Sequence, residues 1–312
     1  MSKRIVVTGG AGFLGSHLCE KLVANGHDVL CVDNFSTGQE KNLNDLTQRN
    51  NFSFRNIDVQ HPFFAEADQI YHLACPASPA FYQLDPIKTT RTAVVGAFNL
   101  LDVALHNNAK ILQASTSEVY GDPEVHPQSE GYLGRGSTSS PRACYNEGKR
   151  CAETLFFDYN RLHRLRVKVV RIFNTYGPRM AANDGRVVSN FIVQALKGEG
   201  ITIYGDGRQT RAFCYVDDMI DGLLYAMASA DDFIGPVNLG NPWEREIGAL
   251  AEMVITLCNS SSRITYEAAH EDDPKRRCPD ISLAQSRFGW QPKISLEDGL
   301  KETIRYFRGL CL

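Results

Sequence analysis

Short apolar runs alternate with longer segments of helical periodicity through the first half of the chain. Apolar runs rich in β-branched residues predict strands, and an apolar position every three or four residues predicts an amphipathic helix. The strands are predicted at residues 4–8, 28–32, 52–57, 69–73, 110–114 and 167–172, and the helices at 13–24, 89–106 and 143–161. This alternation predicts an α/β fold, a doubly wound parallel sheet of the Rossmann type.

The pattern becomes less regular after Asn174. Helices are predicted at 187–197 and 296–307, and a late strand at 236–239 is expected to return to the main sheet. We therefore expect residues 1–174 to form the main domain together with a returning segment at about 213–240. Residues 175–312 would mainly form a smaller, non-contiguous lobe. The ligand cleft is expected between this lobe and the carboxyl ends of the strands.

A glycine-rich segment, TGGAGFLG at residues 8–15, joins the first predicted strand to the first predicted helix. Gly9 allows a sharp turn, Gly12 lets the backbone approach a pyrophosphate, and Gly15 lets the helix pack closely on the sheet. A helix N-terminus at this point offers free N–H groups to phosphates. Asp33 follows 18 residues after Gly15, where a carboxylate can bind the adenosine ribose and repel a 2′-phosphate. The order of these features predicts an NAD-binding domain rather than an ordinary glycine turn.

The amino-acid composition narrows the expected partners and location of the protein. The chain has 312 residues, 43% apolar and 22% charged, with a formal net charge of -3, so neither nucleic acid nor a membrane is an expected partner. The nine cysteines are scattered without a Cys-x-x-Cys pair, which favours buried thiols over a disulfide framework or a zinc site. With no signal peptide and no long apolar run, we expect a cytoplasmic location. The polar run 270–273 has adjacent ligands that rarely converge on one ion, so no metal is expected.

Tyr145 and Lys149 lie four residues apart on a predicted helix and share one of its faces. An ammonium beside a phenol stabilises the phenolate, which would make Tyr145 a base for a hydroxyl proton while hydride leaves the same carbon. The alternative is an exposed Tyr/Lys pair on a helix surface. The dinucleotide motif upstream and the hydroxyl-rich residues 115–118 at the end of a predicted strand favour the catalytic interpretation.

These three features together resemble the extended short-chain dehydrogenase/reductase family, whose members act on nucleotide sugars. The resemblance implies that Thr116 bonds the sugar O4, that Tyr145 is the base and that Lys149 orients the cofactor ribose. It also implies that Asp58 is an acid contacting adenine and that Leu73 lies on a strand lining NAD. Further positions implied at the cofactor are Phe13, Leu14, Asn34, Thr37, Val59, Thr175 and Arg186.

The more specific resemblance is to the UDP-glucuronate decarboxylase branch of that family. It is carried by residues 72–79, 114–127, 141–149, 171–180, 183–191 and 209–213. It implies NAD-dependent decarboxylation of UDP-glucuronate to UDP-xylose through a 4-keto sugar, with hydride returned to C4, in a homodimer built on helices 89–106 and 143–161. The apolar faces of these helices could equally be packed within one chain. Two departures are Ala93, where the family usually has asparagine near the nicotinamide, and Asn146, where aspartate is common.

Ser117 and Glu118 occupy the positions that distinguish the reactions of related enzymes in this family. The 4,6-dehydratases of the family have an Asp-Glu pair there, and the epimerases usually lack the glutamate. A 4-keto sugar with a carboxylate at C5 is a β-keto acid and loses carbon dioxide readily. The resemblance places Arg277 at that carboxylate, which suits a guanidinium. The alternative for Arg277 is a solvated basic loop formed with Lys275 and Arg276.

Other implied substrate contacts are Pro79, Arg91, Asn174, Tyr204 and Arg211, although surface ion pairs are the usual fate of arginines. Two rival functions stay open at this stage. One is a 4-epimerase or 4,6-dehydratase acting on another nucleotide sugar. The other is a non-catalytic NAD(H)-binding sensor, against which the intact set of Thr116, Tyr145 and Lys149 argues.

Overall fold

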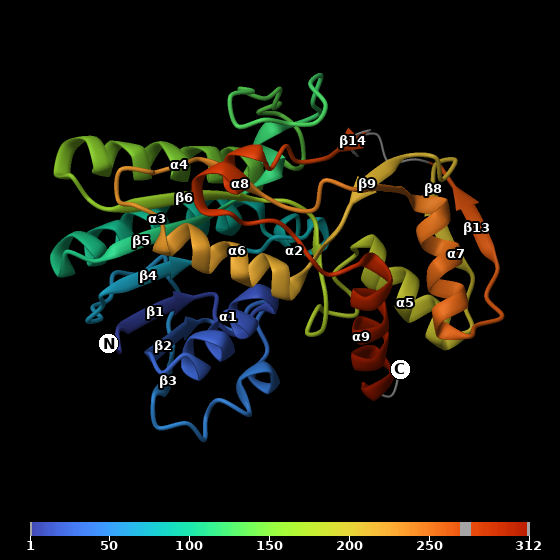
Figure 1. Cartoon of the computed structure of the whole chain (residues 1–312), viewed down its shortest axis with the longest axis horizontal. Coiled ribbons are helices and arrows are strands. Elements are labelled where there is room, and N and C mark those ends of the chain that lie inside the picture. Colours follow the sequence, from blue (N-terminus) through green and yellow to red (C-terminus); the bar gives the residue numbers. More distant parts are fainter. Residues whose placement is uncertain (1, 269–275, 311–312) are drawn as a thin grey trace.

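The computed structural model describes residues 2–268 and 276–310. Its centre is a parallel sheet of seven strands in the order β11-β6-β5-β4-β1-β2-β3 (Figure 1). Their bounds are β1 Arg4–Thr8, β2 Asp28–Asp33, β3 Phe52–Asn56, β4 Gln69–His72, β5 Lys110–Thr116, β6 Val167–Ile172 and β11 Val237–Leu239. The predicted doubly wound parallel sheet is confirmed, and the late strand returns to pair with β6.

Helices cover both faces of this sheet (Figure 1). Successive side chains of β1 point to opposite faces of the sheet. Ile5 and Val7 belong to the apolar core on one face, and Val6 belongs to the core on the other. The helices α1 Phe13–Ala24 and α6 Val216–Ala228 pack on the first core, and α3 Pro86–Asn107 and α4 Ala143–His163 pack on the second. A Cβ on Gly148 of α4 would lie 2.9 Å from the Cβ of Ala93, so the glycine at 148 permits the close approach of α3.

The later part of the chain adds three small sheets and further helices (Figure 1). β7 Thr175–Tyr176 pairs with β10 Cys214–Tyr215, and β8 Ile201–Tyr204 pairs with β13 Ile264–Glu267. β9 Thr210–Ala212 lies between β12 Glu244–Glu246 and β14 Arg276–Arg277. The helices are α2 Pro79–Tyr82, α5 Val187–Lys197, α7 Ile247–Cys258, α8 Ser282–Phe288 and α9 Leu296–Gly309, with 3-10 turns η1 Glu40–Leu43 and η2 Ser117–Tyr120.

Most predicted elements are confirmed, several with the same ends. The helix α6 and the small sheets of the second half were not predicted one by one. The proposed division at residue 174 stays a prediction, and both the run 270–273 and Lys275 lie outside the described residues. Among the helices that the structure describes, none combines the length and the apolar character needed to cross a membrane.

Candidate active site

One cavity of about 520 Å³ opens at the carboxyl ends of β1, β2, β4 and β5, where parallel strands of an open sheet present ligand-binding loops. Residues of the second half of the chain close its other side. The cavity brings together most of the sequence-predicted site residues, namely Gly9, Gly12, Phe13, Leu14, Gly15, Asp33, Asn34, Thr37, Val59, Leu73, Pro79, Thr116, Ser117, Glu118, Tyr145, Lys149, Asn174, Thr175, Arg186, Tyr204, Arg211 and Arg277.

The turn between β1 and α1 is shaped for a dinucleotide. Gly9 has φ +70, and a Cβ on Gly15 would lie only 2.0 Å from the carbonyl oxygen of Gly9. Asp33 is buried at the end of β2, where its carboxylate accepts hydrogen bonds from the N–H groups of Ala11 (2.9 Å) and Phe35 (2.8 Å). Burial raises the pKa of Asp33, while these backbone donors act in the opposite direction. The glycine cradle and the acid beside it therefore fit NAD.

Two predicted positions do not line this cavity. Asp58 accepts a hydrogen bond from Nδ2 of Asn34 at 2.9 Å, and Asn34 itself lines the cavity. Arg91 lies on the exposed face of α3, next to the buried residues Thr92 and Ala93. The helical register turns Arg91 away from the cavity, and the structure does not bring it to a substrate.

The predicted effect of Lys149 on Tyr145 needs correction. Lys149 Nζ donates to the carbonyl oxygen of Ala114 at 2.8 Å and lies 5.9 Å from the centre of the Tyr145 ring. Burial raises the pKa of Tyr145 well above its ordinary value, whereas a lowered pKa was expected. A hydrogen bond with Thr116 and the charge of Arg186 act to lower the pKa of Tyr145 but do not offset its burial.

Glu118 sits in η2 with two arginines beside its carboxylate. Glu118 Oε1 is 3.6 Å from Nη1 of Arg277 and 3.9 Å from Nη1 of Arg142, and the Tyr82 hydroxyl donates to Oε2 at 3.4 Å. The Tyr82 ring stacks on Tyr145 with 5.1 Å between centroids and 4° between planes. The acid and both cations therefore lie next to the phenol that is the predicted base.

Sequence reasoning missed two members of this group. Arg142 stands three residues before Tyr145 in the same motif, and Tyr82 follows Pro79 by three residues. Helical spacing of three or four could have found both, because Tyr82 ends α2 and Arg142 is the N-cap residue of α4.

A buried hydrogen-bond network lies behind the site. Glu153 of α4 accepts from the Ser115 hydroxyl at 2.5 Å and holds Arg171 of β6 through both carboxylate oxygens, at 3.0 and 2.7 Å. Arg171 also donates to the Tyr120 hydroxyl at 3.0 Å, which donates to Asn238 of β11 at 2.8 Å. The network ties α4 to the ends of β5 and β6, so it fixes the backbone beside Thr116 and Glu118.

Comparisons with known proteins agree with this geometry. The model of the NAD dependent epimerase/dehydratase family matches residues 5–240. UDP-glucuronic acid decarboxylase 1 of Xenopus tropicalis is 53% identical over 98% of this chain and 72% of its own. UDP-glucuronic acid decarboxylase 6 of Arabidopsis thaliana is 52% identical over 98% of this chain and 89% of its own.

Two solved structures show the same fold. UDP-glucuronic acid 4-epimerase from Bacillus cereus, in complex with UDP-glucuronic acid and NAD, has a TM-score of 0.88 at 29% identity, covering 98% of this chain and 99% of its own. UDP-glucose 4-epimerase from Thermotoga maritima, with UDP-glucose, has a TM-score of 0.89 at 31% identity, covering 99% and 100%. The chain thus belongs to the NAD-dependent epimerase/dehydratase family and, within it, to the UDP-glucuronic acid decarboxylases.

Proposed function

We propose that this protein is an NAD-dependent enzyme that converts UDP-glucuronate into UDP-xylose and carbon dioxide through a UDP-4-keto sugar. The observation that carries the proposal is the position of Arg277 Nη1, 3.6 Å from Glu118 Oε1, in the cavity that also contains Thr116 and Tyr145. This arrangement places a carboxylate-binding cation and an acid beside the tyrosine that would accept the proton of the sugar hydroxyl. A 4-epimerase whose substrate has no carboxylate does not need the cation.

The glycine turn of residues 9–15, Asp33, Asn34 and Lys149 would hold the cofactor. When bound, NAD⁺ supplies a hydride acceptor for C4, the same hydride for the return step, and a positive charge near the phenol.

Tyr145 would accept the proton of the sugar O4, and the hydrogen-bonded Thr116 hydroxyl would hold O4 and the phenol in line. The buried ammonium of Lys149 is fixed by its bond to Ala114, one turn of α4 from Tyr145. Stacking on Tyr82 restricts the phenol ring to one orientation. These residues pre-arrange the proton transfer, since α2, α4 and β5 together fix their positions.

The C5 carboxylate of a 4-keto sugar lies β to the ketone. When the C5–carboxylate bond breaks, its electron pair moves into the ketone as an enolate and carbon dioxide leaves. Arg277 would orient the substrate carboxylate. The negative charge of Glu118 would repel that carboxylate and so favour the loss of carbon dioxide. A solvent proton reaches C5 through water bound beside Glu118 and Arg277, and Tyr145 returns its proton to O4 at the end. No net redox change results.

The test is proton NMR of the purified protein with UDP-glucuronate and catalytic NAD⁺ in deuterated water. UDP-xylose with one deuterium at C5 and no accumulated NADH is expected. UDP-galacturonate as the product would instead identify a 4-epimerase. Unchanged substrate despite NAD binding would overturn the decarboxylase and favour another sugar nucleotide or the sensor.

The Tyr145→Phe variant separates catalysis from binding. Loss of the phenolic proton acceptor is expected to lower kcat about 10²–10⁴-fold while NAD binding is retained. Isothermal titration with NAD⁺ and the rate of carbon dioxide release measure the two properties. A variant that keeps both would show that Tyr145 is not the base. Wild-type protein that binds NAD without releasing carbon dioxide would favour the non-catalytic sensor.

We also propose a homodimer and a cytoplasmic location. Val95, Phe98 and Leu105 expose apolar side chains along one side of α3, which supports a contact with a second copy. The free state of the cysteines in the described residues supports a reducing compartment. Light scattering should give twice the 34.7 kDa chain mass, and a monomer would refute the dimer.

A further inference from the structure

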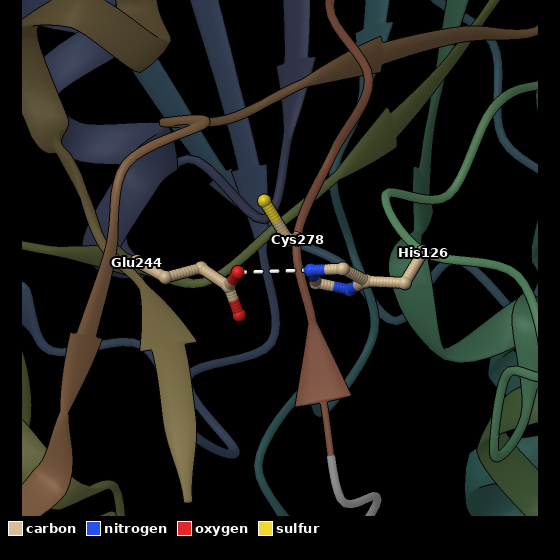
Figure 2. A group of neighbouring side chains, drawn as sticks. All are labelled: His126, Glu244 and Cys278. Carbon is tan, nitrogen blue, oxygen red and sulfur yellow. Dashed lines mark hydrogen bonds and ion pairs between the residues drawn. The ribbon is translucent and has the colours of Figure 1, made fainter.

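Three side chains of different chemistry meet beside the small sheet β12-β9-β14 (Figure 2). His126 comes from the loop after η2, Glu244 begins β12, and Cys278 directly follows β14. Each offers one nitrogen, oxygen or sulfur atom, and these atoms all lie within 4.8 Å of one another. The three residues are far apart in the sequence, so no local spacing could reveal the group.

The three separations, none above 4.8 Å, would need only modest adjustment to form a tetrahedral zinc site. Zinc binds histidine nitrogen and carboxylate oxygen at about 2.0–2.2 Å and thiolate sulfur at about 2.3 Å, which places neighbouring ligand atoms about 3.3–3.8 Å apart. His126 Nε2 and Glu244 Oε2 are 2.9 Å apart, held by a hydrogen bond. A small widening of this pair and a small approach of the sulfur would complete three sides of the tetrahedron.

The surrounding hydrogen bonds hold the Glu244 side chain and the Cys278 backbone in place. The Thr210 hydroxyl donates at 2.5 Å to Oε1 of Glu244, which leaves Oε2 facing His126. The backbone N–H of Cys278 donates to the side chain of Gln128 at 2.9 Å. Such outer contacts orient metal ligands. The side chains of His126 and Glu244 are 30% and 25% exposed, so a cation and a water ligand can enter from solvent.

We propose that His126, Glu244 and Cys278 form a binding site for a divalent cation of the zinc class, with water as the fourth ligand. On binding, the Nε2 proton that His126 donates to Glu244 is replaced by a proton on Nδ1, so that Nε2 and Glu244 Oε2 can both bind the metal. The Cys278 thiol leaves its hydrogen bond to the carbonyl oxygen of Pro242 and releases its proton to solvent as the sulfur–metal bond forms. The mixed nitrogen, oxygen and sulfur ligands favour zinc or cobalt over calcium or magnesium.

The site lies against the strands that carry the cavity arginines. Cys278 follows Arg277, and Glu244 pairs with Ala212, the neighbour of Arg211. The proposed site therefore lies at the end of two strand pairs. These are the antiparallel pair of β12 with β9 and the parallel pair of β14 with β9. A bound cation would fasten the loop of His126 to both pairs and restrict the movement of Arg277.

Cobalt(II) gives the sharpest test because its spectrum identifies its ligands. The full chain, freed of metal with a chelator, is titrated with Co²⁺. We expect a thiolate-to-cobalt charge-transfer band and visible bands of tetrahedral cobalt that saturate at one cation per chain. Added Zn²⁺ should remove them. Absence of the charge-transfer band in the wild-type protein would overturn the proposal.

Variants assign the band to this group. Cys278→Ser should abolish the charge-transfer band, whereas Cys151→Ser, at an exposed cysteine of α4, should keep it. Glu244→Gln and His126→Ala should each weaken Co²⁺ binding about tenfold or more. If the thermal midpoint of Cys278→Ser shows that this variant does not fold, Glu244→Gln and His126→Ala serve as the test. A band retained in Cys278→Ser, or lost in Cys151→Ser, would show that another thiol binds the metal.

Discussion

Lys149 is buried among groups that decide whether its amine carries a charge. Burial lowers its pKa, whereas Cys75 and then Glu153 raise it. His72 of β4 also faces Lys149, and Tyr145 lies one helical turn before it. Glu153 is one turn after Lys149 on the same face of α4. The ammonium form, which we propose holds the cofactor, therefore depends on the carboxylate of Glu153.

We predict that Glu153→Gln narrows the pH range of activity. Without the carboxylate, the pKa of Lys149 falls further, and Arg171 keeps its positive charge without a partner. Because the charged amine is the active form, activity is present below the pKa of Lys149 and lost as pH rises through it. The alkaline limb of kcat/KM against pH should therefore move to lower pH in Glu153→Gln.

Ser115→Ala is the matched control, because it removes a hydrogen bond to Glu153 without removing the charge. It should lower thermal stability while leaving the alkaline limb in place. If both variants lose stability and neither moves the limb, Glu153 has a purely structural role.

At the scale of elements, the turn between β1 and α1 is the most tightly determined part of the site. A methyl group on Gly15 would meet the backbone of Gly9 and Gly10, which cannot move aside as a flexible side chain would. We predict that Gly15→Ala costs about 1–3 kcal/mol of unfolding free energy and weakens NAD binding. Urea unfolding and NAD titration measure these effects. Gly131→Ala, at an exposed position with open space around it, should change neither.

Elements with strong local signals could be predicted closely. β1, α1, β6 and α5 have the predicted ends, because apolar periodicity and the glycine turn define them locally. The start of α3 was placed three residues late. There Asp85 caps the helix by accepting from Lys88 N–H, a signal that precedes the apolar periodicity. The strand β5 runs on to Thr116 because Ser115 and Thr116 pair with β6, which is a non-local cause.

The residues of the candidate site likewise fall into those that a local sequence pattern reveals and those that it does not. Motif positions such as Asp33, Thr116 and Tyr145 could be found because their spacing fits a strand, a turn or a helix. The group around Cys278 could not, since segments distant in the chain meet only through the small sheet β12-β9-β14. The pKa of Tyr145 was also beyond sequence reasoning, because burial decides its direction.

At the scale of the whole molecule, α1 is joined to the segment after β7 by two contacts. His17 Nε2 donates to the carbonyl oxygen of Pro178 at 3.0 Å, and Arg179 pairs with Glu20 at 2.7 Å. The adjoining Arg179 and Met180 line the cavity. The helix that faces the cofactor and the chain that closes the cavity are thus held together by groups on the surface of α1.

This junction should be sensitive to acid. Burial lowers the pKa of His17 to about 4 from its ordinary 6.5, so the folded protein favours the neutral ring. The stabilisation is complete above pH 6.5 and is lost as pH falls toward 4, on the order of 3 kcal/mol for this group. We predict that His17→Gln, which keeps a donor for Pro178 but does not titrate, loses less unfolding free energy than the wild type between pH 7 and pH 4.5.

Urea unfolding at the two pH values gives the comparison, and His61→Gln, at an exposed histidine, is its control. The buried His72, whose pKa burial lowers to about 3, destabilises both proteins equally in acid, so the difference between them isolates His17. Equal acid losses in His17→Gln and the wild type would mean that the junction opens to solvent before His17 takes up its proton. The cavity would then lose its closing segment in acid before the sheet unfolds, and NAD binding would fall ahead of the unfolding transition.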